Sequence, residues 1–179
     1  EKASKSATDL LDNLLIWART RAGNTTFTPD SFTINEVVHS ITDILSVHAE
    51  KKKITIINNT SCKSVIKADR NMIETVIRNL LLNAIKFTHT SGKIILSDSE
   101  TDKTVRFSIE DNGIGMDQET IDNIYKIGAR FNTKGTEGES GTGLGLVLCK
   151  EFLEINNSSL HFESEQGRGS LFWFELSKE

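Results

Sequence analysis

Three short segments, in a fixed order along the chain, constrain its fold more than any other feature of the sequence. Residues 79–87 (NLLLNAIKF) place two asparagines four positions apart within an apolar helical pattern. Residues 111–115 (DNGIG) put an acidic residue just before two glycines, and residues 141–146 (GTGLGL) form a glycine-rich loop that leads into an apolar helix. The fold must therefore accommodate a helix that carries two amides, a tight acidic turn and a flexible loop at the start of a second helix.

Composition sets only broad limits on this chain. Its 179 residues, with 37% hydrophobic and 26% charged side chains, suffice for one well-cored domain with an appendage. A net charge of −4 argues against a nucleic-acid partner, and we expect the one lysine run, residues 51–53, to be the solvated end of a helix. No apolar stretch approaches the ~18 residues of a membrane span, so no membrane contact is expected. Cys62 and Cys149 lack metal-site spacing and are predicted to be unpaired.

The chain is predicted to have three parts. Apolar residues at 3-4-3 spacing over residues 7–22 predict a helix whose apolar face is wide enough for a helical bundle. Gly23 and Asn24 are a helix stop signal, and Pro29, the only proline, lies in a short polar stretch. We therefore expect a truncated bundle-type helix within residues 1–22, a linker over residues 23–30 and a cored domain over residues 31–179. The start at Glu1 rather than methionine indicates a piece of something longer.

The cored domain alternates helical and strand patterns, which predicts an α/β two-layer sandwich with a mixed, mainly antiparallel sheet and helices on one face. Ile44 and His48 are expected on the apolar face of its first helix. In order, the predicted elements are a strand at 31–33, a helix over 34–48, a hairpin of 54–57 with 64–67, a helix from the N-cap Asp69 to about Phe87, strands near 93–99 and 103–110, a short helix at 118–126, a helix over 144–155 and a closing hairpin of 160–164 with 169–176.

The first segment combines an apolar stripe with a separate polar face. Asn79 and Asn83 are four residues apart and Lys86 is seven from Asn79, so all three share one side of a helix. Amide oxygens are neutral, hard ligands of the kind that Mg²⁺ accepts beside phosphate oxygens and waters. The alternative is a pair of exposed polar residues on an amphipathic helix, and without the other two segments it would be the better interpretation.

The two glycine segments suit a flat ligand and its phosphates. Asp111 ends a predicted strand, and Gly113 and Gly115 allow a tight turn beside a carboxylate that can accept from the amino group of adenine. The loop at residues 141–146 precedes a helix whose first N–H groups can bind phosphate. A plain turn and a flexible hinge remain the alternatives for each segment alone. The spacing is neither the GxGxxG of a dinucleotide fold nor a Walker loop.

In this order the three segments resemble the N, G1 and G2 boxes of the ATP-binding domain shared by sensor histidine kinases, gyrase, Hsp90 and MutL, and they are most similar to the histidine kinase branch. The resemblance covers residues 30–179, and residues 7–22 resemble the end of the helical domain that precedes it. It implies a Bergerat-type ATP-binding fold with ATP and Mg²⁺ bound. The expected ATP contacts in the last box are Gly141, Thr142, Gly143, Leu144, Gly145 and Leu146.

The resemblance also implies residue roles. Asn83 is expected to be the Mg²⁺ ligand, Asn79 to support it and Lys86 to face phosphate. Arg130, Phe131 and Lys134 lie in a glycine-rich stretch that resembles the ATP lid, which would close over the triphosphate. The usual phrase with an internal proline at the start of that lid is replaced here by residues 124–128 (IYKIG).

Within the families that share these boxes, the resemblance favours a kinase over an ATPase. ATP-hydrolysing members carry a glutamate where this chain has Asn79, and an amide cannot take a proton from water near neutral pH. The four histidines lack the acidic and proline residues of a phosphoacceptor, and we expect His39 and His48 to be structural. The implied activity is transfer of the γ-phosphoryl group to a histidine on a helix absent from this chain, in a cytoplasmic homodimer that serves a response regulator receiver domain. A conformational ATPase and a non-catalytic nucleotide-binding module are the alternatives.

Overall fold

The structure is a computed structural model that describes residues 26–126, 134–139 and 143–179. The helix predicted over residues 7–22 lies outside the described residues, as do residues 23–25 of the predicted linker. The elements are β1 (Asp30–Thr33), α2 (Ile34–Lys51), β2 (Thr55–Asn59), β3 (Val65–Ala68), α3 (Arg70–Phe87), β4 (Lys93–Glu100), β5 (Thr104–Asp111), α4 (Gln118–Asn123), α5 (Gly145–Ile155), β6 (His161–Glu165) and β7 (Gly169–Ser177).

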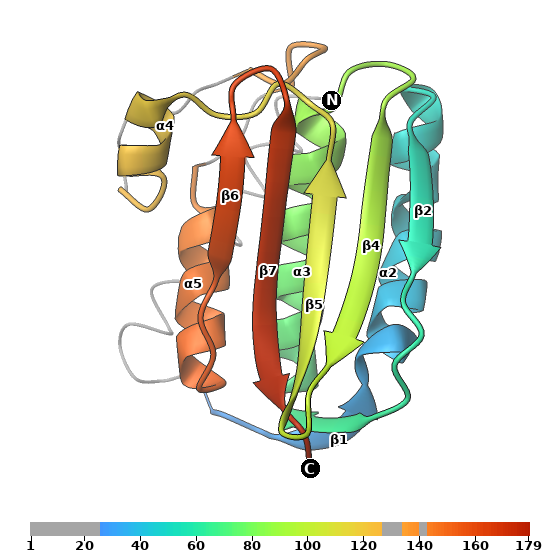
Figure 1. Cartoon of the computed structure of the whole chain (residues 1–179), viewed down its shortest axis with the longest axis vertical. Helices are drawn as coiled ribbons and strands as arrows, with labels where there is room; N and C mark the ends of the chain where they lie inside the picture. The colour runs from blue at the N-terminus through green and yellow to red at the C-terminus, as the bar shows by residue number, and fades with distance from the viewer. Residues whose placement is uncertain (1–25, 127–133, 140–142) are drawn as a thin grey trace.

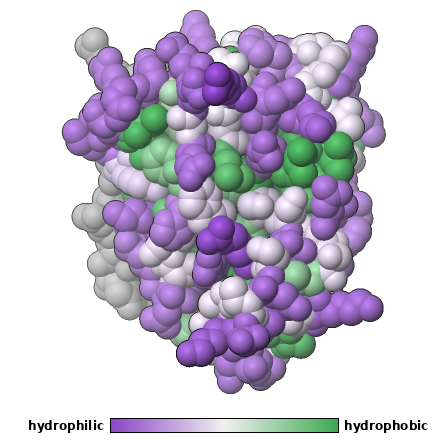
Figure 2. Space-filling model, viewed as in Figure 1, coloured by the Kyte–Doolittle hydropathy of each residue, from purple (hydrophilic) through white to green (hydrophobic). Residues whose placement is uncertain are grey.

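The predicted two-layer architecture is confirmed. A five-stranded sheet has the order β2-β4-β5-β7-β6, and β1 pairs with β3 in a small second sheet. Only β2 and β4 are parallel, so the main sheet is mixed and mainly antiparallel. Figure 1 shows α2, α3 and α5 together behind one face of this sheet. The opposite face is open and mostly hydrophilic, with hydrophobic residues scattered across it (Figure 2).

The hairpin predicted from residues 54–57 and 64–67 is wrong. β2 pairs in parallel with β4, with Thr55 opposite Lys93, whereas β3 pairs antiparallel with β1. The segment between them contacts β4, where the N–H groups of Ser61 and Cys62 donate to the carboxylate of Asp98 at 2.9–3.0 Å. Short β-branched runs fit either partner equally well, so local pattern cannot choose between a hairpin and a crossover.

The apolar face of α2 is narrower than predicted. Its buried residues follow one stripe that ends at Ala49, while Ile44 is 61% exposed and His48 lies on the surface. His39 is exposed as well, so the expected structural role of these two histidines is wrong. Only the stripe that faces α3 and the sheet is covered, because α2 lies at the edge of the helical layer.

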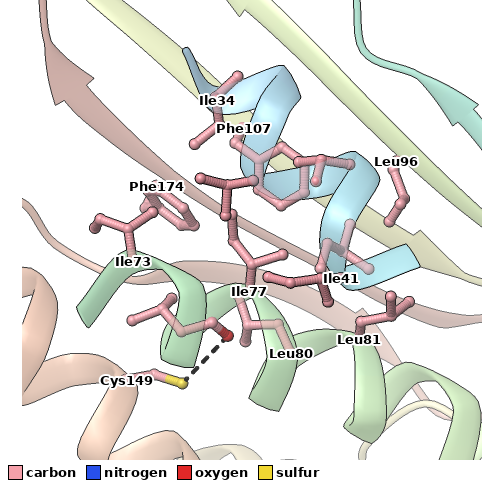
Figure 3. Close-up of a cluster of buried hydrophobic side chains, with 14 of the residues drawn as sticks. Ile34, Ile41, Ile73, Ile77, Leu80, Leu81, Leu96, Phe107, Cys149 and Phe174 are labelled. Carbon is pink, nitrogen blue, oxygen red and sulfur yellow. Dashed lines mark hydrogen bonds between the residues drawn. The ribbon is translucent and has the colours of Figure 1, made fainter. Parts of the chain in front are cut away.

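Helix α3 is the centre of the hydrophobic core. Its predicted N-cap is confirmed, since Asp69 accepts from the N–H of Met72 at 3.1 Å. Figure 3 shows how the buried face of α3 meets α2 at Ile34 and Ile41 and the sheet at Phe107 and Phe174. On the side of α5, the thiol of the buried, unpaired Cys149 donates to the carbonyl of Val76. The residues of α3 on this buried face are Met72, Ile73, Val76, Ile77, Leu80, Leu81, Ala84 and Ile85.

Within the described residues, no helix combines the length and hydropathy required to cross a membrane. Both cysteines are free, as the sequence predicts.

Candidate nucleotide-binding site

The polar side of α3 faces the start of α5. Asn79 donates from Nδ2 to the carbonyl of Thr75 at 3.0 Å, which fixes the orientation of its side chain. A Cβ placed on Gly145, the first residue of α5, would lie 3.3 Å from Oδ1 of Asn79. One turn further along, Asn83 is half-buried on the same helix. The two asparagines therefore lie along a helix whose middle is in direct contact with the glycine-loop helix.

Lys86 continues this face toward the end of α3. Its ammonium group lies 4.6 Å from the centroid of the Phe87 ring, a cation–π contact. Burial lowers the pKa of Lys86, and the nearby carboxylate of Glu139 opposes that shift. A cation that is partly desolvated in this way interacts strongly with an anion that reaches it.

Asp111 is a buried carboxylate at the end of β5. It is 7% exposed, and its Oδ1 accepts from the N–H of Gly113 at 2.9 Å. Burial raises the pKa of Asp111 to about 6, although the backbone N–H groups of Gly113 and Ser170 act in the opposite direction. Such a carboxylate has few partners within the protein to satisfy its charge, so a ligand amino group that donates to it would gain a strong hydrogen bond.

The glycine turn after Asp111 is packed too closely for larger residues. A Cβ at Gly113 would lie 2.3 Å from the carbonyl oxygen of Phe87 at the end of α3. Gly115 has a φ of +62°, and a Cβ there would lie 2.0 Å from the carbonyl oxygen of Glu165. The turn also bonds to both neighbours, from the N–H of Ile114 to the Phe87 carbonyl at 3.1 Å and from the N–H of Gly167 to the Ile114 carbonyl at 2.7 Å.

The described part of the glycine loop is open on its outer side. Gly143 has a φ of +70°, and a Cβ there would meet nothing within 4 Å. Helix α5 begins after Leu144, whose apolar side chain cannot accept a hydrogen bond from the first N–H groups of the helix. Leu144 is buried and Leu146 packs against the core, which anchors the loop where the helix begins. Helix α5 can therefore offer N–H groups of its first turn to phosphate. Gly141 and Thr142 lie outside the described residues.

Residues 134–139 form a turn against the end of α3. The N–H of Thr136 donates to the carbonyl of Lys86 at 3.1 Å, and the N–H of Gly135 to that of Glu139 at 2.9 Å. Lys134, a predicted ligand-binding residue, is exposed at the start of this turn. The other two predicted lid residues, Arg130 and Phe131, lie outside the described residues.

The fold thus brings the described parts of all three segments together around one helix. The start of α5 meets α3 at Asn79, the acidic turn meets it at Phe87 and residues 134–139 meet it at Lys86. Asp111 lies at one side of this arrangement, and the amides and Lys86 lie on the polar side of α3. A buried acceptor, an amide oxygen suited to Mg²⁺, a cation and the N-terminus of a helix are together the chemistry that a nucleoside triphosphate requires.

Two features of the site escaped prediction from sequence. The adjoining ends of β6 and β7 support the acidic turn: the N–H of Met116 donates to the hydroxyl of Ser164, and a Cβ at Gly169 would lie 1.9 Å from the Asp111 carbonyl. The second is Lys52, which is 4% exposed, so the expectation of a solvated lysine run is wrong at this position. A signal was available, because Lys52 follows Leu45 and Ala49 at helical spacing and so continues the buried stripe of α2.

Known proteins match both the sequence and the fold. The family model for histidine kinase-, DNA gyrase B- and HSP90-like ATPases matches residues 68–179. Sensor protein KdpD of Clostridium acetobutylicum is 31% identical over 173 residues, which are 95% of this chain and 19% of KdpD. Sporulation kinase C of Bacillus subtilis is 32% identical over 165 residues, 91% of this chain and 36% of that protein.

A solved structure has a similar fold. Full-length ShkA in complex with AMPPNP matches with a TM-score of 0.83 and 26% identity, over 96% of this chain and 36% of ShkA. The chain therefore spans less than two fifths of the length of each of these relatives. The chain belongs to the family of histidine kinase-, DNA gyrase B- and HSP90-like ATPases and has the fold of a histidine kinase catalytic domain.

Proposed function

We propose that this domain binds ATP together with Mg²⁺ and transfers the γ-phosphoryl group to a histidine on a helix outside the chain. The observation that carries the proposal is the meeting of the acidic turn, the amide face and the glycine-loop helix around α3. Each contributes a different part of the recognition of one ligand, and the chain belongs to a family of ATPases.

The roles follow the chemistry of each group. Asp111 accepts from the adenine amino group, and Gly113 and Gly115 keep the turn thin enough for the base to approach. Asn83 holds Mg²⁺ through its amide oxygen; when bound, the ion neutralises charge on the phosphate oxygens. Lys86 faces the phosphates, and the glycine loop with the start of α5 binds them through backbone N–H groups. The residues assigned to that loop are Gly141, Thr142, Gly143, Leu144, Gly145 and Leu146.

Asn79 argues for transfer rather than hydrolysis. Its Nδ2 donates to the Thr75 carbonyl within α3 and its Oδ1 faces Gly145, so the side chain lies where α3 meets the start of α5. An amide in this place cannot deprotonate water, so we assign it a supporting role and expect the nucleophile to come from another polypeptide segment. Catalysis then rests on positioning and charge stabilisation, as is usual for phosphoryl transfer.

The same proposal extends to the longer protein. Residues 1–22 are assigned to the last helix of a dimerisation domain, residues 23–30 to a linker and residues 31–179 to the kinase domain. The packing of β1 and α2 against the rest of the domain supports its start near residue 31. We place Arg130, Phe131 and Lys134 in an ATP lid. The partners are the phosphoacceptor helix of a homodimer and a response regulator receiver domain, in the cytoplasm where ATP is supplied.

Nucleotide choice tests the binding proposal. Calorimetric titration should give a markedly higher affinity for Mg·ATP than for Mg·GTP, because guanine has a keto group where adenine donates. Asp111→Asn should weaken ATP binding by about ten-fold or more, the effect of losing a charge-assisted hydrogen bond. His39→Ala, on the exposed side of α2, should bind like the unmodified domain. Equal affinities for ATP and GTP would remove the basis for the adenine assignment.

A further inference from the structure

Lys52 is a buried lysine to which the proposed nucleotide-binding roles assign no part. It follows α2, is 4% exposed and reaches across to the end of α3. Its Nζ donates to the carbonyls of Ile85 at 2.8 Å and Lys86 at 3.0 Å. Because the last carbonyls of a helix have no partners within the helix, an ammonium group there satisfies them and is favoured by the helix dipole.

The same ammonium group also holds the turn at residues 134–139. Nζ lies 2.6 Å from the hydroxyl of Thr136 and 2.9 Å from Oε1 of Glu139. The other carboxylate oxygen of Glu139 accepts from the N–H of Glu137 at 2.8 Å. Burial would raise the pKa of Glu139, but the hydrogen bonds from Lys52 and from backbone N–H groups outweigh it and keep that pKa low. Lys52 thus joins the end of α3 to this turn through one charged, hydrogen-bonded centre.

The turn of residues 134–139, bonded to the end of α3, confines the side chain of Lys86. The hydroxyl of Thr136 donates to the carbonyl of Thr88 at 2.9 Å and its N–H to that of Lys86, so the turn spans the end of the helix. Gly135 lies between the two charged residues, because a Cβ there would be 2.3 Å from the Glu139 carboxylate and 2.6 Å from Cγ of Lys86. The stem of Lys86 thus lies against the turn at Gly135, while its ammonium group lies over the ring of Phe87.

We infer that Lys52 is a positioning residue for the phosphate end of the nucleotide site: it anchors the turn of residues 134–139 on α3 and so holds Lys86 toward the phosphates. The inference rests on the proposed nucleotide site. Lys52 does not contact the nucleotide and acts through Thr136, Glu139 and Lys86. It therefore matters for ligands that carry a polyphosphate and not for ligands held mainly at the Asp111 end.

The test compares Mg·ATP with AMP in Lys52→Met. Met keeps the length and the apolar stem but removes the ammonium group. We expect ATP affinity to fall by about ten-fold, as for loss of a charged hydrogen-bonding group, and AMP affinity to change by less than about two-fold. Hydrogen exchange should also accelerate at the Thr136 N–H, which is bonded to Lys86. The matched control is Lys51→Met, one residue earlier and exposed, which should change none of these quantities.

A role of Lys52 in folding alone gives a different result. Equal losses for ATP and AMP, or unchanged ATP affinity in a folded Lys52→Met protein, would overturn the inference. If that variant does not fold, Thr136→Val decides by the same ATP-to-AMP comparison, since it removes only the hydroxyl that accepts from Lys52 and donates to the carbonyls of Lys86 and Thr88. Failure of the proposed function can be distinguished from failure of this inference, because in that case the unmodified domain would bind neither nucleotide.

Discussion

At the scale of single residues, the site contains a buried carboxylate, Asp111, whose ionised form lowers the stability of the ligand-free fold. Asp111 lies at the end of β5 with 7% of its surface exposed, and burial raises its pKa from 3.8 to about 6. The folded state therefore binds the proton more tightly than the unfolded state. The contribution of Asp111 to stability falls as pH rises between about 4 and 6 and stays low above that range. A ligand that donates to the ionised group recovers this loss on binding.

We expect Asp111→Asn to stabilise the ligand-free domain while it weakens ATP binding. The amide keeps an acceptor for the N–H of Gly113 and removes the buried charge. At pH 7.5 the free energy of unfolding should rise by about 1–3 kcal/mol, the scale of the pKa shift. The gain should disappear near pH 4, where the aspartate is protonated. Glu110→Gln, at the exposed neighbouring position, should have little effect. Loss of stability in Asp111→Asn at pH 7.5, measured by denaturant unfolding, would contradict this assignment.

The metal assignment belongs to the same scale. Asn83→Ala removes the amide oxygen that we assign to Mg²⁺, so ATP affinity should lose most of its dependence on Mg²⁺. Asn71→Ala is a matched control, because Asn71 is exposed near the other end of the same helix. Calorimetric titrations of ATP at a series of Mg²⁺ concentrations measure the effect. An unchanged Mg²⁺ dependence in Asn83→Ala would assign the ligand role to another residue.

At the scale of elements, α3 is the support on which the site is assembled. Its apolar face is buried between the sheet, α2 and α5, and its polar face and last turn receive the glycine loop, the acidic turn and residues 134–139. The acidic turn is held on its other side by the turn between β6 and β7. Close backbone approach at this second contact is possible only because Gly115 has no side chain.

Gly115→Ala should therefore be far more damaging than an alanine at another left-handed glycine. Gly138 has a φ of +79° with open space around a Cβ, so Gly138→Ala should cost only the backbone strain, about 1 kcal/mol. Gly115→Ala pays the same strain and in addition must move the Glu165 carbonyl. We expect a lower melting temperature for Gly115→Ala and loss of ATP binding in the folded fraction. Equal melting temperatures for the two variants would show that the contact at Gly115 is not tight.

The elements differ in how far the sequence predicts them. The helix from Asp69 to Phe87 was predictable to its cap, because a good N-cap and a regular stripe coincide. The partner strand of β2 was not predictable, since parallel pairing with β4 depends on contacts between residues distant in the chain. For the site, the residue types and spacing predicted the ligand chemistry. They did not reveal the support from Ser164, because it depends on how separate elements meet. The burial of Lys52 could have been predicted from its helical spacing to Leu45 and Ala49, but its partners on α3 and in residues 134–139 could not.

At the scale of the whole molecule, one face of the sheet carries the helices and the site, and the other is open. We assign groups of the described chain to holding a nucleotide, and the amide of Asn79, which we place beside the phosphates, cannot deprotonate water. A domain of this kind needs a nucleophile from elsewhere, so the chain alone should be nearly silent as a catalyst. This division of labour is the central claim of the proposed function.

Phosphoryl transfer to a separate acceptor tests that claim most directly. The domain is incubated with Mg²⁺ and ATP labelled at the γ-phosphate, alone or with a polypeptide that carries the phosphoacceptor helix of the dimerisation domain. We expect acid-labile, base-stable label on a histidine of the acceptor, none on the domain alone, and no transfer by Asn83→Ala. Brisk release of phosphate by the domain alone, on the order of 1–100 s⁻¹, with no label on the acceptor, would contradict the account and indicate an ATPase.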